Sequence, residues 1–167
     1  MSILFGYRLS NAECSEYGID DDGFSFVIYK NCEAEYKTYI FYNILKKCIK
    51  FRVGESLIKE LEIFIRKNEK IILSLSNDTD NGSCDGVFNK FIFNNKEICT
   101  LNIETYDIEN TKMKNTSYYE EYHDVIIQEN QIMQLFTSIC KILKKYNIYL
   151  TLNVIHLPLY AYIKNKL

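Results

Sequence analysis

The sequence has few prolines and glycines, which are common in long loops, and few histidines, which are common in active sites. It contains one proline, six glycines, no tryptophan and two histidines among 167 residues. So few prolines and glycines indicate few long flexible connections. No stretch approaches the roughly 18 apolar residues of a membrane-spanning helix. Residues 1–14 lack the basic and apolar regions of a signal peptide, so we expect a cytoplasmic protein.

The short motifs of phosphate binding, of hydrolase nucleophiles and of zinc binding are also missing. The sequence contains no G-x-G-x-x-G, no G-x-x-x-x-G-K-[ST] and no G-x-S-x-G. No C-x-x-C pair occurs, which disfavours zinc, and a reducing compartment favours free thiols. Cys99 and Cys140 fall on apolar faces and are predicted to be small core residues. We predict neither a metal nor a cofactor. The six cysteines are Cys14, Cys32, Cys48, Cys84, Cys99 and Cys140.

The composition is that of an ordinary globular protein. Hydrophobic residues make up 47% and charged residues 25% of the chain, a balance that excludes a disordered protein. A chain of this length can bury a sizeable core without disulfides or metals. We therefore predict a single domain spanning residues 1–167.

Hydrophobic periodicity predicts strands and two principal helices. Residues 55–67 carry an apolar stripe at helical spacing, and a second, longer helix is expected over residues 126–146. Asn94–Asn95 is predicted to be the turn of a tight hairpin. Because strands and helices do not alternate regularly, the pattern indicates an α+β fold with a mainly antiparallel sheet. Strands are expected at Ile3–Leu9, Phe24–Tyr29, Tyr36–Leu45, Lys46–Val53, Phe88–Phe93, Glu97–Glu104 and Leu150–Ile155, while Ile71–Leu75 fits a buried strand or a helix end.

Two histidines and one cysteine are the candidate catalytic residues. His123 stands near Glu120 and Asp124, and carboxylates beside a histidine can form a metal site or a general base. No second histidine follows at helical spacing, so a structural role is favoured. Cys84 lies in a polar loop and would need His123 or His156 as its base. We expect that the chain is not an enzyme.

The polar segment that begins at Asn77 resembles part of a calcium-binding loop. Asp78 and Asp80 have the spacing of oxygen ligands, and Gly82 follows them. If Asp78 were the first ligand, the closing glutamate of the loop would fall at Asn89, which is not a carboxylate. A solvated turn is therefore the favoured interpretation.

Charge is segregated along the sequence. Residues 1–36 and 71–110 each carry a net charge of −5, whereas residues 37–70 carry +5 and residues 111–167 carry +3. Acidic side chains in loops favour a basic partner, although ordinary solvated turns would have the same composition. Direct nucleic-acid binding is disfavoured, and the lysines of residues 46–52 are the one basic stripe. The candidate partner-binding residues are Asp20, Asp21, Asp22, Asp78, Asp80, Asp85, Asp107 and Glu109.

Residues 70–146 resemble small bacterial immunity proteins of polymorphic toxins, including those of contact-dependent growth inhibition systems. The resemblance lies in the segment 81–93, the strand that follows it through Glu104, and the segment 121–130. It implies a protein that binds and neutralises a cognate toxin domain, often a nuclease, and that uses an acidic surface when the toxin is basic. It assigns no toxin contacts residue by residue.

Two other functions are compatible with the sequence. One is a small enzyme or ligand-binding domain that uses Cys84 or His123, which would then lie in a concave pocket beside a polar partner. The other is a subunit of a homo-oligomer with a tyrosine-rich strand at its interface.

Overall fold

A seven-stranded sheet organises the fold. The computed structural model describes residues 1–11, 23–40, 44–79, 87–101, 103, 117–152 and 155–156. The strand order is β4-β3-β2-β1-β6-β7-β5, and every pairing is antiparallel except the parallel contact between β5 and β7. The fold is therefore α+β, as predicted. The strands are β1 (Ile3–Asn11), β2 (Gly23–Tyr29), β3 (Glu33–Ile40), β4 (Ile44–Arg52), β5 (Asp78–Thr79), β6 (Val87–Phe93) and β7 (Lys96–Leu101).

Asparagine and glycine occupy the backbone positions that suit them. Asn94 and Asn95 have φ of 50° and 67° in the two-residue turn between β6 and β7. Asparagine tolerates this left-handed region better than most residues, so the predicted hairpin is confirmed. Gly23 opens β2 where a Cβ atom would lie 2.2 Å from the Leu9 carbonyl oxygen.

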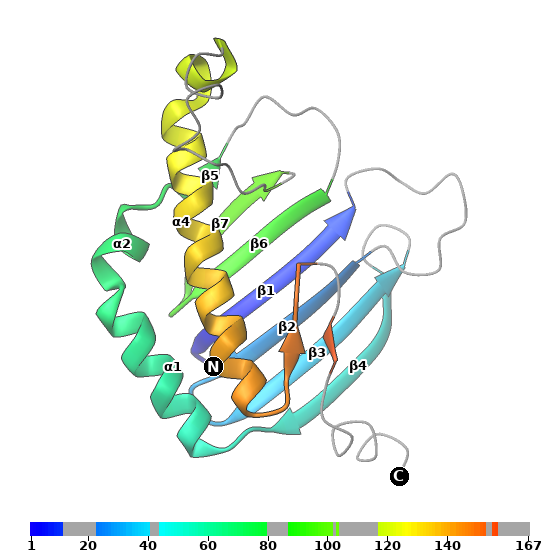
Figure 1. The fold of residues 1–167 in the computed structure, drawn as a ribbon. Coiled ribbons are helices and arrows are strands. Elements are labelled where there is room, and N and C mark those ends of the chain that lie inside the picture. The colour runs from blue at the N-terminus through cyan, green and yellow to red at the C-terminus, as the bar shows by residue number, and fades with distance from the viewer. Residues whose placement is uncertain are drawn as a thin grey trace.

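In the described part of the chain, three helices cover one face of this sheet (Figure 1). They are α1 (Glu55–Lys67), the short α2 (Glu69–Ser74) and α4 (Ser117–Lys145). The buried side of α1 includes Leu57 and Leu61, and α4 contributes Phe136 and Ile139. These side chains and the aromatic residues of the sheet form one core. The sheet contributes the fully buried Phe5, Tyr7, Phe26, Phe91 and Phe93.

Polar contacts join the helices to each other and to the sheet. Glu60 on α1 accepts hydrogen bonds from Lys145 at the end of α4 and from Tyr146 Oη, the latter at 3.2 Å. Glu129 belongs to α4 and is fully buried against the sheet. It accepts a hydrogen bond from Thr100 Oγ1 on β7 at 3.0 Å. Because a buried polar group is costly without a partner, this contact fixes where α4 crosses the sheet.

A tyrosine at the centre of the sheet holds the C-terminal part of the chain. The Tyr7 hydroxyl lies 2.7 Å from Asn89 Oδ1 and 2.6 Å from the carbonyl oxygen of Leu152. Leu152 lies between β8 (Tyr149–Leu150) and β9 (Ile155–His156), which pair with each other and not with the main sheet. The single last strand predicted over Leu150–Ile155 is therefore wrong.

Several predicted boundaries differ from the structure. The strands predicted at Tyr36–Leu45 and Lys46–Val53 are divided instead between Ile40 and Ile44, with a register shift at Thr38 and Tyr39. Residues 71–74 are helical and belong to α2. The long helix starts at Ser117 and not at residue 126, so about a third of its 29 residues precede the predicted start, and Tyr122 has non-helical dihedrals where it kinks. Among the described residues, no helix is long and apolar enough to span a membrane.

Candidate functional site

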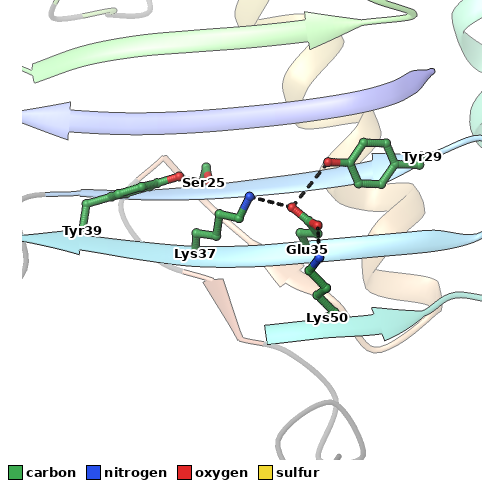
Figure 2. A network of polar contacts seen from close by, with 6 residues as sticks. All are labelled: Ser25, Tyr29, Glu35, Lys37, Tyr39 and Lys50. Carbon is green, nitrogen blue, oxygen red and sulfur yellow. Dashed lines mark hydrogen bonds and ion pairs between the residues drawn. The ribbon is translucent and has the colours of Figure 1, made fainter. Parts of the chain in front are cut away.

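The face of the sheet opposite the helices is the first candidate for a functional surface. We call this the open face. In β3, Ala34 is fully buried on the helix side, and Glu35 and Lys37 alternate onto the open face. The neighbouring strands follow the same rule, which brings Ser25, Tyr29 and Lys50 to that face beside them (Figure 2).

Glu35 is the centre of a polar network on the open face. Its carboxylate lies 2.7 Å from Lys37 Nζ and 3.2 Å from Lys50 Nζ, and the Tyr29 hydroxyl donates to it at 3.4 Å (Figure 2). Burial disfavours the charged form, but the hydrogen bonds from the two lysines outweigh it and hold the pKa of Glu35 below its usual value. The same hydrogen bonds raise the pKa of Lys37 and of Lys50. All three groups are therefore charged near neutral pH.

Aromatic rings and further ion pairs extend the network. The Tyr39 hydroxyl lies 3.0 Å from Ser25 Oγ, and the guanidinium of Arg8 lies 4.9 Å from the centre of the Tyr39 ring. On the other side of Arg8, Lys90 Nζ lies 2.8 Å from Glu97. Cations, carboxylates and tyrosine rings thus lie in contact with one another across the open face.

One end of the sheet is the second candidate. Asn11 of β1 pairs with Val87 of β6, and Ser10 pairs with Gly23, the first residue of β2. At the same end, Phe88 pairs with Leu101, the last residue of β7. These strand ends lie together at one end of the sheet (Figure 1), which we call the acidic end after the sequence segments that begin or finish there.

Three segments that begin or finish at this end of the sheet are strongly acidic. Segments 12–22, 80–86 and 104–116 together contain ten acidic and two basic side chains, a net charge of −8. The rest of the chain contains 12 acidic and 18 basic side chains, a net charge of +6. The described strand ends that flank these segments are neighbours, so the acidic segments of the sequence begin or finish at one end of the sheet.

The predicted partner-binding residues fall in or beside these segments. Asp78 is the one that the structure describes: it is exposed and pairs in register with Cys99. The other candidates lie outside the described residues, so their positions stay predictions. They are Asp20, Asp21, Asp22, Asp80, Asp85, Asp107 and Glu109.

Apolar side chains are exposed beside the acidic end, a feature that sequence patterning missed. Ile44 and Leu45, at the start of β4, are 60% and 51% exposed, and Phe88 is 38% exposed. Leu45 pairs with Tyr39, which pairs with Gly23, so these residues lie at the same end of the sheet. The two β4 residues belong to a run that periodicity placed across a strand boundary, which is why their exposure was not expected.

His123 does not line the groove that the structure contains. His123 lies near the start of α4 with its ring about half exposed, and Nδ1 lies 3.1 Å from Asp124 Oδ1. This groove, of about 430 Å³, lies between α1 and the end of the sheet opposite the acidic end. Its lining includes Lys59, Arg66 and Glu62 and does not include His123. Cys84 lies outside the described residues.

The cysteines and the calcium-like segment have structural surroundings. Cys140 packs against the core, as predicted, but Cys99 is half-buried on the open face and not in the core. The prediction for Cys99 was wrong because the neighbouring Thr100 turns inward to reach Glu129. Asn89, at the twelfth position of the calcium-like segment, is buried and bonded to Tyr7. Among the described residues, no three potential ligands are close enough to hold a metal ion.

No protein-family model matches the chain, and no curated protein matches it either. The candidate surfaces must therefore be interpreted from their own geometry and charge.

Proposed function

We propose that this chain is a protein-binding domain that captures a basic partner at its acidic end, and that it acts as the immunity protein of a bacterial toxin. The observation that carries the proposal is the origin of three acidic segments at neighbouring strand ends. A net charge of −8 on 31 residues concentrates a negative potential, which accelerates encounter with a basic protein.

The described residues at this end supply the second ingredient of a binding surface. Charge steers a partner, but affinity comes mainly from apolar and aromatic side chains that lose water on contact. Ile44, Leu45 and Phe88 are exposed there, and Tyr39 lies between them in the same cross-strand row. Exposed apolar side chains at the strand ends where acidic segments begin or finish suit a toxin surface that must bind nucleic acid and is therefore basic.

The proposal is tested with the toxin domain itself. The reading frame immediately upstream of the gene should encode a toxin-like C-terminal domain, and co-expression of this chain should rescue growth. The purified pair should bind with nanomolar affinity, and its association rate should fall steeply as salt is added. No detectable binding to that domain would reject the immunity role.

Charge variants locate the binding surface. Replacing Asp20, Asp21 and Asp22 with asparagine removes three charges from the acidic end and should slow association by roughly tenfold at low salt. The matched control is Glu55→Gln, Glu62→Gln and Glu69→Gln, a set of exposed residues on α1 and α2. Because the control changes net charge equally at a distance from the acidic end, its association rate should fall much less.

A further inference from the structure

The outer edge of β4 is a second surface that the acidic end does not explain. In the part of the chain that the structure describes, β4 pairs with β3 and with no strand on its other side. It is nine residues long, whereas β5, at the opposite edge of the sheet, has two. A long edge strand presents a row of backbone donors and acceptors that can pair with another chain.

The register shows which backbone groups face outward. The Val53 amide donates to the Cys32 carbonyl at 2.9 Å, which makes these two residues a hydrogen-bonded pair at the end of the β3–β4 ladder. Hydrogen-bonded and non-hydrogen-bonded pairs alternate along antiparallel strands. The N–H and C=O groups of Cys48, Lys50 and Arg52 therefore point away from β3.

The side chains of β4 carry charge of one sign. The strand contains Lys46, Lys47, Lys50 and Arg52 and no acidic residue. The Lys50 ammonium contacts Glu35, but its side chain is still 72% exposed. Lysines on an edge strand oppose pairing with a second copy of the same strand, because the facing charges repel. An acidic strand would meet attraction in place of that repulsion.

We propose that β4 receives an extended acidic segment of a partner protein, which adds an eighth strand to the sheet. Main-chain hydrogen bonds to Cys48, Lys50 and Arg52 would supply the pairing, and the basic side chains would select for carboxylates. This inference goes beyond the proposed function, because it concerns the edge of the sheet and not the acidic end.

The first test separates backbone pairing from charge. The probe is a fluorescent peptide as long as β4 with alternating valine and glutamate. Cys48→Pro removes one outward N–H without removing a bond to β3, which is where an edge strand tolerates proline. Binding should fall at least tenfold in Cys48→Pro and stay unchanged in Cys48→Ala, which keeps the N–H. Equal binding by both variants would overturn strand addition.

A measurement on the unmodified protein guards against misfolding of the proline variant. Amide hydrogen exchange at Cys48, Lys50 and Arg52 should slow when the acidic peptide is added, because their N–H groups become hydrogen-bonded. Exchange at Phe51, whose N–H already points toward β3, should change little. Unchanged exchange at the three outward amides under saturating peptide would also overturn the proposal.

The second test addresses the chemistry of the occupant. Lys50→Gln with Arg52→Gln should weaken the acidic peptide severalfold, and a peptide with lysine in place of glutamate should not bind. A single-stranded oligonucleotide that displaces the peptide and binds Cys48→Pro normally would show a nucleic-acid surface instead. Self-association abolished by Cys48→Pro would show that a second copy occupies the edge. Either result would contradict the proposal that β4 receives an acidic segment.

Discussion

Replacing Tyr7 with phenylalanine should destabilise the protein far more than removing a hydroxyl from the half-exposed face of the sheet. The Tyr7 ring is fully buried and packs against Phe91 and Phe136 with ring centres 5.1 and 4.9 Å apart. Phenylalanine keeps that packing. What it loses is the hydroxyl that lies against Asn89 Oδ1 and the Leu152 carbonyl.

The size of the effect follows from what stays behind. Asn89 is buried, so its amide oxygen loses a partner that water cannot readily replace. An unsatisfied buried acceptor costs about 1–3 kcal/mol, and the Leu152 carbonyl loses its tether to the sheet as well. For a chain of this size each kcal/mol lowers the melting temperature by roughly 2–4 °C.

Urea unfolding monitored by circular dichroism measures the change in the free energy of unfolding. The matched control is Tyr29→Phe, which removes a hydroxyl from the half-buried open face, where water can take its place. It should cost less than about 0.5 kcal/mol. Equal costs for the two variants would refute the claim that the Tyr7 hydroxyl anchors the C-terminal segment.

The raised pKa of Tyr7 adds a dependence on pH. Burial raises the pKa above the ordinary tyrosine value, with a smaller contribution from Cys140. The folded state therefore holds its proton more tightly than the unfolded state. This stability is fully present below about pH 10 and is lost as pH rises further. Tyr7→Phe should flatten the decline in unfolding free energy between about pH 10 and pH 11, whereas an unchanged slope would contradict this origin.

Three further predictions concern single side chains. Burial raises the pKa of Cys140 to about 12, so iodoacetamide at pH 8 should leave it unmodified in the folded protein and alkylate it in urea, as mass spectrometry would show. Glu35→Gln should lower the free energy of unfolding by less than about 1 kcal/mol, because the ion pairs of Glu35 border solvent. Since the pKa of Glu35 is lowered in the folded state, this contribution is present above about pH 4.5 and is lost as pH falls. Urea titrations at pH 7 and pH 3 would measure it. Thr100→Val should cost about 1–3 kcal/mol in urea unfolding because Glu129 loses a buried donor. Thr79→Val removes a hydroxyl whose hydrogen bond to the Cys99 carbonyl is long, at 3.4 Å, and it should cost much less.

Local signals predicted the elements whose ends are marked by turn-forming or helix-ending residues. The Asn94–Asn95 hairpin rests on a turn preference, and α1 rests on an apolar stripe that is followed by the helix-ending Asn68. Both follow from interactions within a few residues. The α+β class followed in turn, because the order of strands and helices has no regular alternation.

The elements that were misplaced depend on contacts between distant residues. The first turns of α4 are polar and carry no apolar stripe that periodicity could detect, so Ser117 was not recognised as its start. Thr100 reads as a solvent-facing strand residue, yet it turns inward because Glu129 lies above it. The parallel pairing of Asp78 with Cys99 likewise has no local signal.

The candidate site shows the same division. The acidic segments are visible in the sequence, but their common origin at one end of the sheet depends on strand order. The open-face network is invisible in the sequence, because Glu35, Lys37 and Lys50 are ordinary alternating polar residues until β3 and β4 pair. Charge could therefore be predicted as a property of segments, and its placement could not.

The most direct test of the central claim is the rate at which the chain associates with the basic toxin domain, measured by stopped-flow fluorescence at increasing salt. The acidic end predicts a fast rate at low salt that falls steeply, and a much shallower fall when Asp20, Asp21 and Asp22 are asparagine. A rate that does not depend on salt, or that drops equally for the Glu55, Glu62 and Glu69 control, would contradict binding at the acidic end.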